Sequence, residues 1–294
     1  MKLGQKDPPL GLAHFTVLDL PPLELLRLAA AVGYAFVGLR LFPAFPGAPF
    51  YRVPPGSDAM REMRRRIDGD GVRVHDIEFV TIAADFVPAD LAPVLESAAA
   101  LGAHRLSVCG DDPDRPRLVA NFAELCDLAA DFDLGVDLEC MAWRQVASLP
   151  DAARVVAAAG RPNGGVLVDA LHLARTGGVP AVLRDVPPAM IRSAQLCDAP
   201  AARPASVDAI IQEARSGRLA PGEGALPLRA LLVELPDDAI LSVEVPMAGA
   251  APPEDRARRI FAATGRLFEA CRQAPSNRNQ AGTPPSLEPM GGPI

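Results

Sequence analysis

The chain has 294 residues, a formal net charge of -7 at pH 7 and 49% hydrophobic residues, a composition typical of a soluble globular protein. An acidic chain without a basic run is a poor nucleic-acid binder, because phosphate neutralisation dominates that affinity. No apolar stretch approaches the roughly 20 residues of a membrane helix, and the N-terminal segment MKLGQKDPPLGLAHF lacks the apolar region of a signal peptide. We therefore expect a cytoplasmic protein without nucleic-acid or membrane partners.

The basic residues have an unusual distribution. Lysine occurs only at Lys2 and Lys6, and every other basic residue is arginine. Both lysines precede the first expected strand, so neither a Schiff-base lysine in a folded core nor a P-loop lysine is available. The five cysteines are widely spaced without a CxxC pair, which is typical of reduced thiols rather than a disulfide framework or a zinc ribbon.

Short apolar, β-branched runs alternate along the chain with longer amphipathic stretches rich in Ala, Leu and Arg. The runs predict eight strands, at 13–18, 35–40, 72–79, 104–109, 134–140, 165–169, 191–196 and 239–245. The stretches predict helices over 22–32, 57–68, 89–101, 115–130, 147–159, 178–185, 205–216, 225–234 and 253–272. A glycine often separates a helix from the next strand, as in AVGYAFVGL, and is suited to a left-handed helix cap.

Eight strand–helix units in about 250 residues predict an α/β fold, a closed (β/α)8 TIM barrel. Strands that are apolar throughout suit a parallel sheet buried on both faces. A doubly wound open sheet is the alternative, but it normally has a Gly-rich turn after its first strand, where this chain has VLDLPP. We predict one barrel domain over 1–273, closed by a C-terminal helix. The Pro-, Gly- and polar-rich tail 274–294 is predicted to be disordered.

A long loop, 41–56, follows the second expected strand. Long loops in compact domains are usually functional or mobile. Its aromatic residues would suit a lid over a site; they are Phe42, Phe45, Phe50 and Tyr51.

Chemistry in such a barrel lies at the carboxyl ends of the strands. The last four strands each end in an oxygen donor inside an apolar run, namely Glu139, Asp169, Gln195 and Glu244. Three buried carboxylates at one barrel mouth would repel one another, and a buried carboxylate without a partner is costly. A hard divalent cation removes this conflict, and all-oxygen donors favour Mg²⁺ or Mn²⁺ over Zn²⁺. The alternative is that each acid caps a helix or pairs with an arginine.

The motifs VDLEC, VDALH, QLCDA, PGEG and SVEVP, in this order, resemble the xylose isomerase-like TIM-barrel superfamily, the sugar phosphate isomerase/epimerase group. The resemblance covers roughly residues 10–270. It implies one divalent metal ion held by Glu139, Asp169, Gln195 and Glu244. Ketose 3-epimerase-like members usually have His at the position of Gln195, whereas the 3-dehydroshikimate dehydratase branch resembles this chain in using Gln.

The resemblance implies a metal-dependent sugar isomerase or epimerase that acts on a small polyol or hydroxy-keto substrate. A carboxylate would remove the proton α to a carbonyl, and the metal would stabilise the resulting enediolate. Glu139 and Glu244 would flank the substrate and exchange protons, with His172 as a hydrogen-bond donor or acid near neutral pH. The alternative is a metal-dependent dehydratase, like 3-dehydroshikimate or inosose dehydratase, that expels a β-hydroxyl group instead. Family members often form homo-oligomers.

Further polar residues near the strand ends are candidates for substrate contact. Arg40 could bind a substrate carboxylate or phosphate, or offset Glu78. Trp143 could wall the pocket or pack in the core. Asp198 is expected to support a metal ligand, and Glu223 to be aimed inward by the PGEG turn or to lie in a plain turn. No Gly-rich phosphate cradle follows the last two strands, so the sequence gives no support for a phosphorylated substrate.

Overall fold

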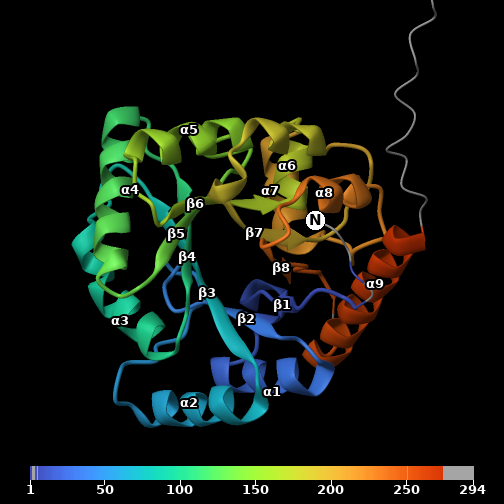
Figure 1. Cartoon of the computed structure of the whole chain (residues 1–294), viewed down its shortest axis with the longest axis horizontal. Coiled ribbons are helices and arrows are strands. Elements are labelled where there is room, and N and C mark those ends of the chain that lie inside the picture. Colours follow the sequence, from blue (N-terminus) through green and yellow to red (C-terminus); the bar gives the residue numbers. More distant parts are fainter. Residues whose placement is uncertain (2–3, 5, 250, 274–294) are drawn as a thin grey trace, which may run out of the picture.

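The computed structural model describes residues 1, 4, 6–249 and 251–273. Eight parallel strands close into a single barrel in chain order, and helices surround it (Figure 1). The predicted TIM barrel is confirmed. The tail predicted to be disordered, 274–294, lies outside the described residues.

The element bounds are as follows. The strands are β1 (Leu10–Leu12), β2 (Phe36–Leu39), β3 (Arg73–Ile82), β4 (Arg105–Gly110), β5 (Gly135–Glu139), β6 (Gly164–Asp169), β7 (Ile191–Leu196) and β8 (Ile240–Val243). The α-helices are α1 (Pro22–Val32), α2 (Asp58–Asp70), α3 (Ala92–Ala100), α4 (Arg115–Ala130), α5 (Leu149–Ala159), α6 (Ala170–Arg175), α7 (Val207–Ser216), α8 (Leu228–Glu234) and α9 (Pro253–Gln273). Short 3-10 helices are η1 (His14–Val17), η2 (Pro88–Leu91), η3 (Pro180–Asp185) and η4 (Pro188–Met190).

The first strand is the one strand placed wrongly from the sequence. The chain pairs through β1, whereas most of the predicted strand 13–18 forms η1. Gly11 allows β1 to lie close to both neighbours, since a Cβ there would come within 3.1 Å of the Cβ of Ser242. The first two backbone amides of η1 then turn inward and donate to Glu78, so they cannot continue the strand ladder.

The helix after β6 also differs from its prediction. The sequence predicts 178–185, but α6 begins directly after the strand, and the predicted range mostly forms η3. Asp169 caps α6, because its side chain accepts a hydrogen bond of 2.8 Å from the backbone N–H of His172. This immediate turn from strand to helix holds His172 beside the barrel mouth.

The last helix closes the ring, as predicted. α9 packs along α1 at the outside of the barrel (Figure 1). The buried hydroxyl of Tyr34 donates to the backbone carbonyl of Ala257 over 3.0 Å and ties the two parts together. Among the described residues, none of the helices is long and apolar enough to cross a membrane.

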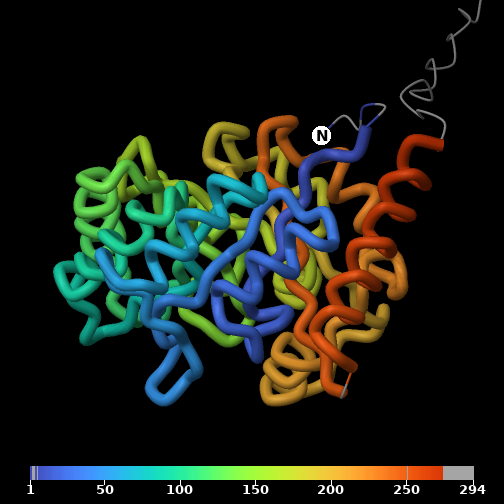
Figure 2. The backbone as a smooth tube through the Cα atoms, turned by 90° about the horizontal axis from the view of Figure 1, so that it is seen from below, coloured from blue at the N-terminus to red at the C-terminus, as the bar shows by residue number. Residues whose placement is uncertain are grey.

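The site-bearing segments project from one end of the barrel. The segment after β2 and the region around α7 protrude on the same side, away from the N-terminus (Figure 2). Parallel strands place all their carboxyl ends on one side of a barrel. The residues that follow β2, β5, β6, β7 and β8 therefore share one mouth.

Candidate active site

The four expected oxygen donors gather at this mouth. Glu139 and Asp169 end β5 and β6, Gln195 lies next to the end of β7, and Glu244 directly follows β8. Asp169 pairs in register with Gln195 across β6 and β7. All four side chains are buried, so the barrel holds three carboxylates in a region that excludes most water.

Unsatisfied oxygens in this group fit a cation. Glu139, Asp169 and His172 each offer a ligand atom, and these atoms lie within 4.8 Å of one another. Gln195 Nε2 donates to Glu244 Oε1 over 3.3 Å, which brings the fourth donor into the same group. Among the described residues, Glu139 Oε1 and Gln195 Oε1 are buried without a hydrogen-bond partner. Buried acceptors without partners are rare in native structures, and carboxylate and amide oxygens are ligands for Mg²⁺ and Mn²⁺. The residues present therefore fit a divalent metal ion, with His172 as a further candidate ligand.

Arg218 lies among these acids, although no sequence pattern predicted it there. Its Nη1 donates to Asp169 Oδ2 over 2.5 Å, and its Nη2 lies 2.9 Å from Glu244 Oε2. Nη1 also lies 3.2 Å from the backbone oxygen of Glu244. The guanidinium is 2% exposed, so it offsets two of the three carboxylates directly.

No local pattern marks Arg218 in the sequence, because it lies in the irregular segment between α7 and α8. An isolated bridge between Gly217 and Met247 brings this segment against the chain that follows β8. The only signal was indirect: buried acids in a chain with two N-terminal lysines need a metal or arginines. The structure contains one such arginine alongside donors suited to a metal.

Burial and mutual repulsion change the acidity of these carboxyl groups. Burial, with Asp169 and Glu244 nearby, raises the pKa of Glu139 well above its usual range. Burial raises the pKa of Glu244 to about 7, although Arg218 opposes the shift. Burial acts the same way on Asp169, but Arg218 and His172 outweigh it and hold the pKa of Asp169 below its usual value. A carboxyl group that titrates near neutral pH is suited to proton exchange.

His172 is a neutral hydrogen-bonding group in this environment. Burial lowers its pKa to about 4, which favours the neutral ring, and with it the predicted role of hydrogen-bond donor over that of acid. Arg218 Nη2 lies 3.4 Å from His172 Nε2, and a guanidinium can only donate. This contact favours the tautomer with its proton on Nδ1, an atom that is buried without a hydrogen-bond partner among the described residues. The ring makes an edge contact with Trp143, at 5.1 Å between centroids and 72° between planes.

A cavity of about 200 Å³ opens above this group of acids. Glu139, His172, Arg218 and Glu244 line it together with Trp143. The indole therefore walls the pocket, one of its two predicted positions. Cys140 and Cys197, which follow β5 and β7, are buried beside the acids, and burial raises the pKa of both thiols.

Arg40 and Glu78 form a buried ion pair beside the same cavity. Arg40 Nη2 donates to Glu78 Oε2 over 3.1 Å, and Arg40 lines the cavity. The Glu78 carboxylate also accepts from the backbone N–H of His14, over 2.5 Å, and from that of Phe15, over 3.3 Å. Glu78 itself is not one of the described residues that line the cavity. It positions Arg40 and the turn after β1, and the structure gives it no direct access to substrate.

Two other predicted substrate contacts lie away from the cavity. Asp198 accepts hydrogen bonds from three backbone amides, of Ala199, Gly222 and Leu226. These bonds fold the segment after β7 and leave Asp198 no described bond to a metal ligand. Glu223 pairs with Arg259 of α9, so the PGEG turn aims it toward the outer helix rather than inward.

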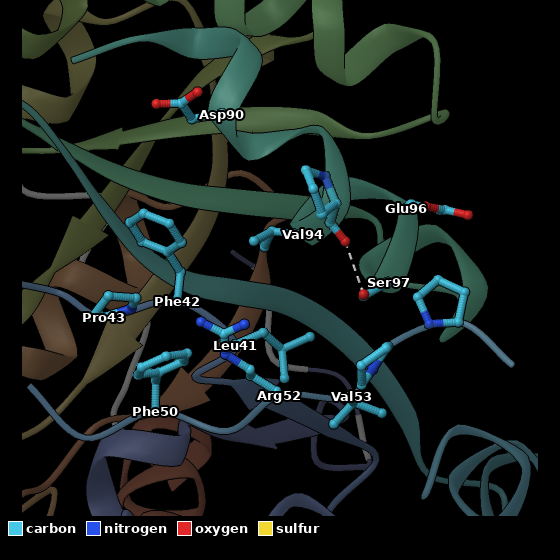
Figure 3. A pocket seen from close by; sticks show the side chains of 13 residues that line it. Leu41, Phe42, Pro43, Phe50, Arg52, Val53, Asp90, Val94, Glu96 and Ser97 are labelled. Carbon is cyan, nitrogen blue, oxygen red and sulfur yellow. Dashed lines mark hydrogen bonds between the residues drawn. The ribbon is translucent and has the colours of Figure 1, made fainter. Parts of the chain in front are cut away.

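The aromatic residues of the loop 41–56 divide between two places. Phe45 lines the central cavity and is 44% exposed. Phe42 and Phe50 instead line a separate outer pocket of about 370 Å³ between this loop and the region of α3 (Figure 3). Tyr51 stacks on His14, with ring centroids 5.2 Å apart. Of the four aromatic residues proposed for a lid, Phe45 is the one positioned over the central site.

The fold and the barrel-mouth donors define a family. The family model for the xylose isomerase-like TIM barrel matches residues 26–265. The chain therefore belongs to this family. No curated protein matches its sequence.

Solved structures share this fold at low sequence identity. A xylose isomerase-like TIM barrel/4-hydroxyphenylpyruvate dioxygenase fusion protein is 21% identical, with a TM-score of 0.72 over 92% of this chain and 46% of that one, so the chain spans about half of that protein. An IolI protein with a bound zinc atom is 17% identical, with a TM-score of 0.74 over 90% and 99%. A D-psicose 3-epimerase from Clostridium cellulolyticum H10 is 13% identical, with a TM-score of 0.68 over 90% and 99%. Likeness at these identities establishes the fold alone.

Proposed function

We propose that the protein is a divalent-metal-dependent sugar isomerase or epimerase that abstracts a proton α to a carbonyl. One observation carries the proposal: two acceptor oxygens at the barrel mouth, Glu139 Oε1 and Gln195 Oε1, are buried without hydrogen-bond partners among the described residues. Glu139, Asp169, Gln195 and Glu244 would hold the ion, and their oxygen chemistry favours Mg²⁺ or Mn²⁺. When bound, such an ion polarises a carbonyl and stabilises the negative charge that develops on its oxygen.

Glu139 and Glu244 are the proposed proton-transfer groups. Both line the cavity, and burial raises the pKa of each toward or above neutrality. A carboxylate with a raised pKa is a stronger base, and the corresponding acid can return the proton to a different face or carbon. Among the similar structures, the D-psicose 3-epimerase was solved with D-tagatose, a sugar of the proposed class of substrate.

The remaining residues orient the substrate and keep water out. Trp143 forms one wall, and its edge contact with His172 fixes the imidazole. His172 lines the cavity, and its Nδ1 has no hydrogen-bond partner among the described residues, so it would donate to a substrate oxygen that reaches it. Arg218 holds Asp169 and Glu244 in place through its two ion pairs.

Metal analysis of three matched forms tests the proposed ligands. The wild type should bind one divalent ion per chain. Glu244→Gln, which removes a charge but keeps the shape, should lower the metal affinity at least about tenfold. Gln195→His should retain an ion but shift its preference toward Zn²⁺, because imidazole suits zinc. Unchanged affinity and metal preference in both variants would exclude this site.

Solvent exchange tests the chemistry across a range of candidate substrates. The metal-loaded protein is incubated in D2O with a panel of ketoses and with 3-dehydroshikimate, and proton NMR follows the α-hydrogen. Deuterium at the α-carbon together with an isomeric product supports the proposal. Loss of water with a new conjugated ultraviolet absorption would assign a dehydratase instead. Glu139→Gln provides the matched negative control, since its shape is retained while its base is removed.

A further inference from the structure

We infer that the central cavity selects a substrate with a carboxylate group, which Arg40 and Arg215 bind. The inference rests on the proposed function for the reacting end of the substrate and adds its chemical class. A neutral free sugar would not need such a binding site for a carboxylate. Four arginines line this cavity, namely Arg40, Arg144, Arg215 and Arg218.

Arg40 is held in advance for planar recognition. Its guanidinium lies between two rings, 4.9 Å from the centroid of Phe15 and 5.3 Å from that of Phe79. Glu78 takes one donor, Nη2, and the side chain is 3% exposed. Nε is buried without a partner among the described residues, and none of them accepts from Nη1. A fixed guanidinium with unused donors favours a carboxylate, which matches its geometry.

Arg215 supplies a second positive charge at the rim. Its guanidinium lies 5.0 Å from the ring centroid of Phe45, and both residues line the cavity. Among the described residues, Arg215 forms no ion pair, unlike the three other arginines of the cavity. Its charge is therefore available to a ligand.

The cavity also has few neutral hydrogen-bonding groups. Among the described lining residues there is no Ser, Thr, Asn, Gln or Lys. Many of its other lining residues are aromatic or apolar, including Phe15, Phe79, Met141 and Trp143. Each sugar hydroxyl buried without a partner would cost binding free energy. A short acid with few hydroxyl groups and an apolar face fits these walls better than a free hexose.

The pairing of the cavity's arginines agrees with one negative charge on the ligand. Arg40, Arg144 and Arg218 pair with acids, whereas Arg215 has no ion pair among the described residues; the acids are Glu78, Asp111, Asp169 and Glu244. A monoanionic substrate would supply the partner that Arg215 lacks. The cavity holds no Gly-rich backbone cradle of the kind that binds phosphate in such barrels, so the structure assigns the charge to a carboxylate.

Three small probes of matched shape test this assignment without turnover. Benzoate, benzamide and phenyl phosphate are titrated into the full, Mg²⁺-loaded chain, and the fluorescence of Trp143, the single tryptophan, reports binding. Benzoate should bind at least about ten times more tightly than benzamide and more tightly than phenyl phosphate. Equal affinity for benzoate and benzamide would overturn the inference. Tighter binding of phenyl phosphate would overturn the choice of carboxylate.

Variants locate the contact. Arg215→Met should weaken benzoate binding about threefold, and Arg40→Met should abolish the preference over benzamide. Arg215 is exposed, so its variant keeps the test valid even when Arg40→Met fails to fold beside Glu78. Arg52→Met is the matched control, because Arg52 lies over Phe50 in the outer pocket, and it should change nothing. Loss of the preference in this control variant would contradict the assignment.

The two proposals fail separately. A metal-dependent α-proton exchange on neutral ketoses, without any benzoate preference, would leave the proposed function standing and remove the inference. A clear benzoate preference without metal-dependent exchange on any substrate would do the reverse.

Discussion

Two layers of polar side chains fill the inside of this barrel, and they differ in how completely they are satisfied. The inner layer includes Asp137 of β5 and Ser193 of β7. The outer layer includes Glu139 and Gln195, two residues further along the same strands. Residues two apart on a strand share a face, so both layers point the same way into the barrel.

In the inner layer, nearly every buried polar atom described below has a hydrogen-bond partner. Ser193 donates to Asp137 Oδ2 over 2.8 Å, and the neutral ring of His75 contacts the same hydroxyl over 3.0 Å. Burial lowers the pKa of His75 to about 4. Arg105 donates to the other oxygen of Asp137. The one unpaired buried atom in this layer, within the described part of the chain, is a donor, Nε of Arg105.

In the outer layer, acceptors rather than a donor lack hydrogen-bond partners. Two of its acceptor oxygens, on Glu139 and Gln195, are buried without hydrogen-bond partners in the part of the chain that the structure describes. A cation would stabilise an unpaired acceptor oxygen that lies among carboxylates, whereas a carboxylate with a donor on each oxygen is already stabilised. Buried acids alone therefore do not identify a metal site. Buried carboxylate and amide oxygens without hydrogen-bond partners are the better indication.

Replacing one acid in each layer should separate the layers most strongly. Glu139→Gln removes a proposed metal ligand and base, so the turnover rate should fall about 10³-fold. Metal affinity should fall with it, while the thermal midpoint of the metal-free protein should not drop, because burial already disfavours the ionised form of Glu139 and the amide keeps its shape. Turnover assays, metal titration and calorimetry measure the three effects. Retention of full activity would show that Glu139 belongs to the structural layer after all.

Asp137→Asn should have the complementary result. The change leaves Arg105 without its buried ion pair, which should cost about 3 kcal/mol of unfolding free energy. The amide still accepts from Ser193, so the barrel should remain folded. Urea denaturation measures the loss, and metal analysis should find the wild-type stoichiometry. Loss of the metal would instead mean that the two layers act as one site.

Arg218 bridges stability and metal binding. Arg218→Met should cost the metal-free protein about 2 kcal/mol, since Asp169 and Glu244 lose their cation. Glu244 can take up a proton near neutral pH, which relieves part of the repulsion. Mg²⁺ should then restore most of the loss, so its effect on the thermal midpoint should exceed that in the wild type.

The matched control for this variant lies on the surface. Arg184 is 69% exposed and pairs with Glu234, so Arg184→Met should leave the response to Mg²⁺ unchanged. An equal response in Arg218→Met and Arg184→Met would show that Arg218 does not compensate for the absent cation.

The regular parts of the molecule were predictable because their signals are local. α1 has a Pro start and ends at Gly33, which has a φ of 107°, and both marks are visible in the sequence. β1 was misplaced because its three residues, LGL, carry no β-branched signal. The carboxylate of Glu78 accepts hydrogen bonds from the amides that follow this strand. Because Glu78 lies 64 residues beyond His14, no local pattern reveals this contact.

The site was predictable to the same extent. Strand ends revealed Glu139, Asp169, Gln195 and Glu244, because parallel strands fix where their ends meet. Arg218 lies in an irregular segment, where no period predicts the direction of a side chain. The inner layer could have been found, since Asp137 stands two residues before Glu139 in VDLEC and therefore on the same face.

The smallest predicted effect concerns Asp76, which lies in the inner layer of β3. Its Oδ2 accepts from Ser107 over 2.8 Å. Burial, with Glu78 nearby, raises its pKa to about 8. The unfolded chain loses this proton above its ordinary value of 3.8, whereas the folded chain keeps it up to about 8. Stability should therefore fall as the pH rises through this window.

Asp76→Asn cannot titrate, so it removes this dependence. The variant should gain on the wild type by at least about 1 kcal/mol between about pH 5 and about pH 8, measured by urea denaturation at each pH. Asp127→Asn is the control, because Arg161 lowers the pKa of Asp127 and its effect lies at acid pH. A constant difference between Asp76→Asn and the wild type would mean that Asp76 is already ionised in the fold. The inner layer would then hold a charge without a cation, and the contrast with the outer layer would no longer separate structure from function.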